Sequence, residues 1–265
     1  MNEAILKTTD ASAILCDASI AAQVGDDWFD PAHWQAGAVS GGRGSAWRVQ
    51  TPVGAAVLRH YRRGGAVARL LGDRYWWQGA EQTRPFVEFR LLQRLQSLQL
   101  PVPQPLAARF HRRGWFYRAD LMTRLVANAA TLAERLAARR VDAETMQRIG
   151  ATLAQFHAAG AWHADLNAHN VLLVDMPAHA SLGGRDEPAT AVHLIDFDRG
   201  ELRRRNGAWA EDNLARLRRS LVKLGAAADG ESEFDRRLWQ PLRAGYSAAR
   251  RQIDTDAAAA AGPTA

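Results

Sequence analysis

The sequence has little of three things that would point to particular chemistries: cysteine, lysine and long apolar runs. Its one cysteine, Cys16, excludes an internal disulfide and a cysteine-rich metal cluster, which is typical of a reducing cytoplasm. Its two lysines, Lys7 and Lys223, leave no GKT or GKS sequence, and this excludes a P-loop. No stretch of about 18 apolar residues exists, so no segment is expected to span a bilayer. The first residues lack a basic start followed by an unbroken apolar run, so we expect no signal peptide.

The charge is positive, with 34 Lys+Arg against 28 Asp+Glu and a net charge of +6. Nearly all of the positive charge is arginine, which reflects either a coding bias or a surface that meets phosphates and carboxylates through guanidinium forks. Nucleic-acid binding is a competing explanation, because an expected helix over 211–224 carries Arg216, Arg218 and Arg219. These arginines also suit a solvated helix face, and no nucleic-acid motif is present, so we expect no nucleic-acid partner.

The composition of the 265 residues is that of a globular protein, with 47% hydrophobic and 23% charged residues. This length suits one large domain or two small lobes that share a cleft. A strand-rich beginning and a helix-rich remainder predict an α+β fold with segregated lobes. The expected parts are a flexible N-terminal arm over 1–24, a first lobe over 25–125, a second lobe over 126–253 and a frayed tail over 254–265.

Local patterns predict the elements that would carry a site. Strands are expected within 38–61 around a glycine-rich turn, and apolar residues at helical spacing predict a helix over 85–98. The second lobe is expected to contain helices within 131–159 that end at Gly160, strands over 170–175 and 191–197 joined by an exposed loop, and the helix over 211–224.

The most specific pattern is HADLNAHN, residues 163–170. It runs into the expected strand NVLLVD and is followed, after a loop, by LIDFD, residues 194–198. Asp165, in a loop after a long helix, can project into a cleft, and Asn170 at the start of the next strand can face the same space. Asp196, at the end of the neighbouring strand, adds a carboxylate. Such oxygens suit Mg²⁺, with phosphates supplying further ligands, and Asp165 remains available to accept a hydroxyl proton. This arrangement is what phosphoryl transfer requires.

Each of these signals also has an ordinary structural explanation. Asp196-Phe-Asp198 is a common strand-to-turn ending, the turn over 41–45 can simply reverse the chain, and Glu88 can lie on a solvated helix face. His169 and His193 are expected to be packed or surface residues rather than ligands. Found together and in order with HADLNAHN, the signals favour phosphotransfer.

The pattern HxDLxxxN followed by IDFD resembles the catalytic loop and metal motif of protein-kinase-like phosphotransferases. With GGRGS and VLRHYRRGG upstream, residues 38–224 resemble the lipopolysaccharide kinase family, and most closely its members that act on 3-deoxy-D-manno-octulosonic acid (Kdo). The resemblance implies a protein-kinase-like fold with a β-rich N-lobe, a helical C-lobe and ATP between them. It also implies that Asp165 is the catalytic base, that Asn170 and Asp196 bind Mg²⁺, and that His163 braces the loop.

On the ATP side, the resemblance implies a nucleotide-binding role for residues of the first lobe. The glycines of GGRGS would let backbone amides approach the phosphates, and Glu88 would pair with a strand lysine, whose position is held here by Arg59. Arginine can still hold phosphates and Glu88 through its fork. The glycines in question are Gly41, Gly42 and Gly44.

Two departures from protein kinases point to a small acceptor. Asp198 stands where the protein-kinase DFG motif has glycine, and there is no APE motif. About 65 residues follow Asp198, too few for a protein-docking subdomain. The resemblance implies phosphorylation of a Kdo hydroxyl, at O-4, on Kdo-lipid IV(A) in lipopolysaccharide core biosynthesis. Two alternatives remain: another small-molecule kinase of this fold, for a heptose or an antibiotic, and a non-catalytic scaffold.

The stretch 59–77 interleaves arginines with aromatic residues and leucines. It is either a strand-to-helix connection with buried aromatics or a docking segment for an anionic membrane surface. The resemblance implies peripheral binding at the cytoplasmic face of an inner membrane, where the acceptor is a Kdo-bearing lipid A precursor. The sequence leaves the oligomeric state open. The residues concerned are Arg59, Tyr61, Arg62, Arg63, Arg69, Leu70, Leu71, Arg74, Tyr75, Trp76 and Trp77.

Overall fold

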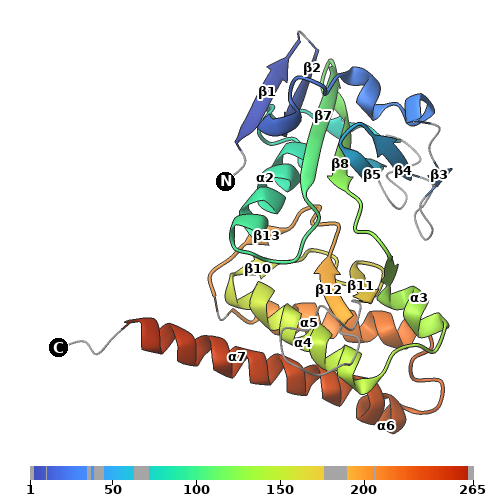
Figure 1. Cartoon of the computed structure of the whole chain (residues 1–265), viewed down its shortest axis with the longest axis vertical. Helices are drawn as coiled ribbons and strands as arrows, with labels where there is room; N and C mark the ends of the chain where they lie inside the picture. Colours follow the sequence, from blue (N-terminus) through green and yellow to red (C-terminus); the bar gives the residue numbers. More distant parts are fainter. Residues whose placement is uncertain are drawn as a thin grey trace. The chain divides into compact units, whose positions relative to one another are not determined.

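The computed structural model describes residues 3–9, 11–34, 37–38, 45–62, 72–175, 190–205 and 207–261. The chain forms two compact units, Met1–Val126 and Ala127–Ala265, coloured blue to green and green to red in Figure 1. The boundary lies one residue beyond the one expected from the sequence.

The N-terminal unit is built on one antiparallel sheet in the order β1-β2-β7-β8-β5-β4-β3, with β6 paired to β8. The long hairpin of β7 and β8 lies in the middle of this order, and helix α2 packs against both strands. The strands are β1 (Ala4–Thr8), β2 (Ser12–Asp17), β3 (Gly37–Ala38), β4 (Ala46–Thr51), β5 (Gly54–His60), β6 (Tyr75–Trp76), β7 (Pro105–Arg113) and β8 (Phe116–Arg124). The helices are η1 (Ala18–Ile20), η2 (Asp26–Phe29), η3 (Pro31–Trp34) and α2 (Arg84–Ser97).

The expectation of a flexible arm over 1–24 is wrong. Strand β2 is buried along its whole length and pairs with both β1 and β7 (Figure 1). The Cys16 side chain is fully buried, in a core cluster with Trp28 and Phe29 of η2. Lys7 of β1 donates a hydrogen bond of 2.8 Å to the Val24 carbonyl oxygen. The segment is therefore part of the sheet and its core.

Helix α2 confirms the helix expected over 85–98, displaced by one residue. Pro85 stands in its first turn, where a missing backbone N–H costs nothing. Phe86 and Phe89 lie on its buried face, and Phe86 packs on Phe110 of β7 with ring centroids 5.3 Å apart. Glu88 lies on the same buried face and is only 2% exposed, so the solvated position considered from the sequence is wrong.

The C-terminal unit combines helices with two small antiparallel sheets, ordered β12-β11-β9 and β10-β13. No helix among the described residues has the length and apolar character needed to cross a membrane. The strands are β9 (Ala129–Thr131), β10 (Ala161–Trp162), β11 (Val171–Asp175), β12 (Thr190–Leu194) and β13 (Glu201–Leu202). The helices are α3 (Leu132–Ala137), α4 (Ala143–Ala158), α5 (Trp209–Lys223), α6 (Glu231–Phe234), η5 (Asp235–Trp239) and α7 (Gln240–Ala261).

The pairing of β11 with β12 places two parts of the sequence motif together. Val171 lies opposite Leu194, so the start of β11 and the end of β12 share one end of the sheet. The strand expected over 191–197 ends at Leu194, and Asp196 adopts a left-handed backbone with a φ of 62°. The loop expected between the two strands lies at 176–189, outside the described residues.

Helices α4 and α7 cross at close range, and glycine makes the approach possible (Figure 1). A Cβ atom on Gly150 would collide with the Leu242 carbonyl oxygen, and one on Gly245 with the Gln147 carbonyl oxygen. Helix α7 continues to Ala261, so most of the tail expected to be frayed is helical, and 262–265 lie outside the described residues.

Replacing Gly150 with alanine tests this crossing. Alanine ordinarily stabilises a helix interior by about 1 kcal/mol relative to glycine. At this crossing we expect the opposite, a loss of about 1–3 kcal/mol in the free energy of unfolding, because the backbones are forced apart. Chemical denaturation measures the difference. Gln155→Ala, at an exposed position of α4, is the matched control, and equal or higher stability of Gly150→Ala would contradict the close approach.

Candidate active site

The motif 163–170 forms a loop between β10 and β11 in the C-terminal unit. Gly160, with a φ of 81°, ends the α4 segment in the left-handed conformation that glycine adopts without strain. Its carbonyl oxygen accepts a hydrogen bond of 2.7 Å from the Arg203 N–H, next to β13. The backbone that leads into the loop is thereby fixed by the end of α4 and by the segment next to β13.

His163 is buried and joins the loop to the end of β12. Its Nε2 lies 2.9 Å from the Ile195 carbonyl oxygen, and its Nδ1 lies 3.1 Å from the backbone nitrogen of Asp165. Because a carbonyl only accepts and an N–H only donates, Nε2 carries the proton and Nδ1 accepts. Burial lowers the pKa of His163, which keeps the ring neutral in this bridging role.

Helix α5 holds the backbone of the loop from the other side. The Asn213 side chain accepts a hydrogen bond of 3.2 Å from the His163 N–H and donates one of 2.9 Å to the His163 carbonyl oxygen. About two helical turns further along the same face, the Ser220 hydroxyl accepts a hydrogen bond of 3.1 Å from the Ala168 N–H. Asn213 is 2% exposed, so its amide satisfies two backbone groups that have no access to water.

The Asp165 carboxylate, in contrast, faces outward, with its side chain 58% exposed. One oxygen lies 3.4 Å from Nη1 of Arg216 on α5, and the other accepts a hydrogen bond of 3.1 Å from the Asn167 amide. The Asp165 carbonyl oxygen accepts a further hydrogen bond of 2.9 Å from the Asn170 side chain. A rigid backbone therefore presents an accessible and oriented carboxylate.

Asn170 and Asp196 lie next to each other through the backbone. The Ile195 N–H donates a hydrogen bond of 3.1 Å to the Asn170 carbonyl oxygen, so Asp196 follows directly on this contact. Asn170 uses its side-chain nitrogen on Asp165, which leaves its side-chain oxygen to accept or to bind a cation. Oxygen donors of this kind fit Mg²⁺ with phosphates completing its shell, and no group of three or more His, Cys, Asp or Glu ligands forms among the described residues.

Phe197 fixes the chain immediately after Asp196. It is 1% exposed and stacks on Phe156 of α4 with ring centroids 5.8 Å apart. The His163 ring also packs on Phe197, with ring centroids 4.7 Å apart. The middle residue of the DFD sequence thus ties the predicted metal ligand to the same core that holds the loop.

The N-terminal unit brings together two other predicted residues, Arg59 of β5 and Glu88 of α2. The Arg59 guanidinium forms an ion pair with the Glu88 carboxylate, and the Tyr61 hydroxyl donates to the same carboxylate. Arg59 also lies over the Tyr61 ring, with Cζ 4.5 Å from its centroid. Arginine therefore makes the strand-to-helix pair at the position where the resemblance to protein-kinase-like enzymes implies a lysine.

Other predicted residues of this unit lie beyond what the structure describes. Gly41, Gly42 and Gly44 belong to 39–44, outside the described residues. In the stretch 59–77, residues 63–71 are likewise outside them. The described aromatic residues of the stretch divide between the two interpretations, because Tyr61 and Tyr75 are buried whereas Trp76 is 56% exposed.

The chain is similar in sequence to known proteins of one family. The family model described as "Lipopolysaccharide kinase (Kdo/WaaP) family" matches residues 33–246, most of the chain. The chain belongs to the lipopolysaccharide kinase (Kdo/WaaP) family. The 3-deoxy-D-manno-octulosonic acid kinase of Stenotrophomonas maltophilia (strain R551-3) is 46% identical over 216 residues, 80% of this chain and 81% of the relative. The protein of the same name from Xylella fastidiosa (strain M12) is 44% identical over 241 residues, 89% of this chain and 90% of the relative.

The family assignment confirms the expected α+β, protein-kinase-like fold and the enzyme class. This lipopolysaccharide kinase is a phosphotransferase with an alcohol group as acceptor. Among solved structures, "WaaP in complex with acyl carrier protein" is similar with a TM-score of 0.44 and 15% identity, covering 83% of this chain and 87% of that one. That likeness is too distant to add to the assignment.

The sequence alone missed three residues of α5 that serve this kinase's loop. Asn213, Arg216 and Ser220 lie on one face of the helix and each contacts the loop 163–170. A signal was present in the sequence, since Asn213 directly precedes Leu214 on the apolar side of an amphipathic helix. A polar residue there is either a defect of the core or a buried hydrogen-bonding group.

Replacing Asn213 with alanine tests the support that α5 gives to the loop. The His163 N–H and carbonyl groups would stay buried without partners, at a cost of about 1–3 kcal/mol each. We expect both the melting temperature and kcat to fall, because the backbone that carries Asp165 loosens. Thermal unfolding and steady-state kinetics measure the two effects.

The neighbouring exposed residue provides the control for this test. Asp212→Ala removes a side chain of α5 that points to solvent and should leave both quantities unchanged. Wild-type kcat in Asn213→Ala would show that the loop does not depend on these hydrogen bonds.

Proposed function

We propose that this kinase transfers the γ-phosphoryl group of ATP to a hydroxyl group of Kdo on a Kdo-bearing lipid A precursor, in lipopolysaccharide core biosynthesis. The observation that carries the proposal is the loop 163–170, whose backbone is held by buried hydrogen bonds while the Asp165 carboxylate remains accessible. The names of the similar proteins from Stenotrophomonas and Xylella support Kdo as the acceptor. We further infer O-4 as the accepting position and Kdo-lipid IV(A) as the lipid.

In this proposal Asp165 orients the acceptor hydroxyl and takes its proton. Positioned general bases of this kind contribute roughly 10²–10⁴-fold in rate. The Arg216 guanidinium and the Asn167 amide each contact one carboxylate oxygen, so they restrict the rotation of the carboxylate. The carboxylate is therefore already oriented when the acceptor binds, so little of the activation free energy is needed to bring the side chain into place.

Asn170 and Asp196 are the residues that would hold Mg²⁺. When bound, the ion neutralises charge on the phosphates of ATP. The chain's own contribution is to fix the two oxygen donors, Asn170 through its hydrogen bond to the Asp165 carbonyl oxygen and Asp196 between Ile195 and the buried Phe197. The support for this assignment is the chemistry of the donors and their joint anchoring.

On the nucleotide side, we propose that Arg59 contacts the ATP phosphates and that Glu88 orients it. The pair is partly shielded, with Arg59 21% and Glu88 2% exposed at the side chain, which strengthens the interaction relative to a surface ion pair. A planar guanidinium can bind a carboxylate and a phosphate through different N–H groups. Gly41, Gly42 and Gly44 complete this proposal as the backbone that approaches the phosphates.

We propose that the kinase works as a peripheral protein at the cytoplasmic face of the inner membrane. Its acceptor is carried on a lipid, and its net charge of +6 favours contact with an anionic surface. Binding to the membrane surface is independent of the transfer chemistry and is testable separately.

Changing Asp165 to asparagine tests the reaction and the acceptor together. The amide keeps the size of the side chain but cannot take the hydroxyl proton, so we expect kcat to fall at least about 100-fold. The measurement is transfer of label from γ-labelled ATP with Mg²⁺ to Kdo-bearing lipid A precursor, to the same lipid without Kdo, and to a generic protein. Only the Kdo-bearing lipid should be labelled.

Asp229→Asn is the matched control, because Asp229 lies in an exposed turn of the same unit. It should retain the wild-type rate, and the melting temperatures of all three proteins should agree. Near wild-type transfer by Asp165→Asn would refute the role of Asp165. Labelling of the lipid that lacks Kdo, or of the protein, would refute the acceptor.

A further inference from the structure

The β7–β8 hairpin changes character toward its tip. Near the middle of the sheet, Arg109 lies opposite Asp120 and donates two hydrogen bonds to it, at 3.1 and 2.9 Å. Two residues closer to the tip, on the same face, His111 lies opposite Arg118. The opposite-charge pair has given way to two basic side chains, which form no salt bridge with each other across the strands.

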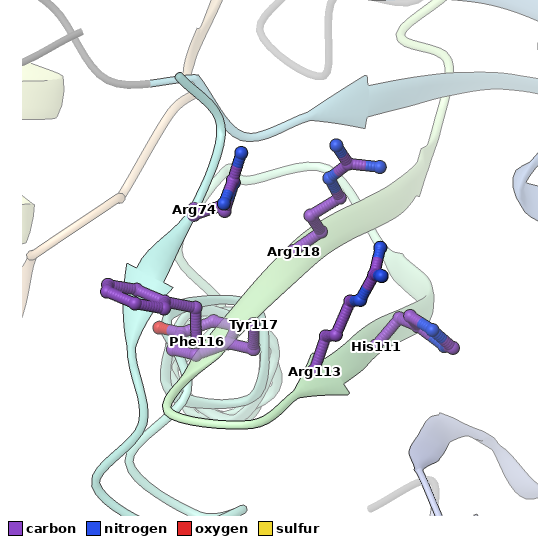
Figure 2. A pocket seen from close by; sticks show the side chains of 6 residues that line it. All are labelled: Arg74, His111, Arg113, Phe116, Tyr117 and Arg118. Carbon is purple, nitrogen blue, oxygen red and sulfur yellow. The ribbon is translucent and has the colours of Figure 1, made fainter. Parts of the chain in front are cut away.

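The next pair on the same face is Arg113 opposite Phe116, which places a further basic side chain closer to the tip. The face encloses a cavity of about 500 Å³. Figure 2 shows the Arg74, Arg113 and Arg118 side chains extending to one side of the hairpin. The lining residues are Arg74, His111, Arg113, Phe116, Tyr117 and Arg118.

The acidic residue Asp73 pairs with one of the arginines that line this cavity. Asp73 contacts Arg118 at 2.9 Å, and it also lies 3.0 Å from Nε2 of His60. Within the described part of the chain, Arg113 and His111 make no side-chain hydrogen bond or ion pair. The Arg113 guanidinium therefore adds positive charge to the cavity, which fits an anion with several oxygens, such as a phosphate.

Two exposed indoles stand beside this cavity. Trp76 and Trp115 are 56% and 69% exposed, and their rings stack with centroids 5.9 Å apart at 15°. Trp76 also meets the Phe116 ring edge-on at 5.5 Å, so the cavity wall and the indole pair are continuous. Tryptophan at a water-exposed tip is costly in solution but suits the boundary between lipid headgroups and acyl chains.

We propose that this hairpin tip, comprising the arginine-lined cavity with Trp76 and Trp115, is the surface by which the protein docks on an anionic bilayer. The indoles enter the interfacial layer, and the arginines bind headgroup phosphates. The exposed indole pair beside the arginines commits the surface to a lipid partner, because duplex nucleic acid and soluble phosphate offer the same charge but no apolar layer for the indoles. The proposal rests on the proposed function for its setting, a kinase with a lipid-borne acceptor.

Sedimentation of the full-length protein with vesicles tests the surface. The probes are vesicles of phosphatidylcholine alone and of phosphatidylcholine with phosphatidylglycerol. We expect binding to the anionic vesicles only, weakened about 30-fold by Arg113→Glu, since the change removes one positive charge and adds one negative charge at the surface. Trp115→Ala should also weaken binding to the anionic vesicles relative to the wild-type protein, and it should reduce the quenching of tryptophan fluorescence by brominated lipids. Arg140→Glu, at an exposed position of the C-terminal unit, is the matched charge control.

Three results would overturn the proposal. The first is equal binding by Arg113→Glu and Arg140→Glu, and the second is complete displacement from vesicles by inorganic phosphate alone. The third is binding of duplex DNA with the same dependence on Arg113 and Trp115, which would assign the surface to nucleic acid.

The wild-type protein separates this proposal from the proposed function. Sedimentation with anionic vesicles without label transfer to the Kdo-bearing lipid would refute the function and leave the docking surface standing. Transfer to detergent-dispersed lipid without sedimentation would refute the docking surface alone.

Discussion

Two hydrogen bonds between the Asn213 amide and the backbone of His163 are the constraint on which the candidate active site depends. They satisfy the peptide N–H and carbonyl groups of His163, a residue that is only 2% exposed. With His163 held, its neutral ring bridges Asp165 and Ile195 and so connects the loop to the end of β12. The positions of the carboxylate and of both candidate metal ligands follow from this one anchor.

In this site the supporting residues are buried and hydrogen-bonded, whereas the Asp165 carboxylate is accessible. His163 and Asn213 are each 2% exposed, whereas the Asp165 side chain is 58% exposed. A buried, fully hydrogen-bonded frame keeps polar groups in place before the substrate arrives, which lowers the reorganisation needed for transfer. The left-handed backbone at Asp196 fits the same picture, because Phe197 on its far side is locked in the core.

The sequence predicted what is local and missed what depends on distant packing. Helix α2 and the loop 163–170 were found because periodicity and motif spacing are local. Strand β2 is not predictable in this way, because its burial comes from pairing with β7, more than 90 residues further along the chain. The pattern of α5 marks Asn213 as a polar residue on an apolar side, but it does not identify the partner, since His163 is 50 residues away. The sequence also could not distinguish an exposed Glu88 from a buried one, because only the sheet beneath α2 decides that.

The central claim is that the accessible carboxylate of Asp165 directs phosphate to a sugar hydroxyl, and its most direct test is to locate that phosphate. The full-length protein, Mg²⁺ and ATP would be incubated with Kdo-bearing lipid A precursor, and the product fragmented by tandem mass spectrometry. The account predicts one added phosphate, on the Kdo fragment. Phosphate on the lipid A fragment, or ATP consumed with no phosphorylated lipid, would contradict it.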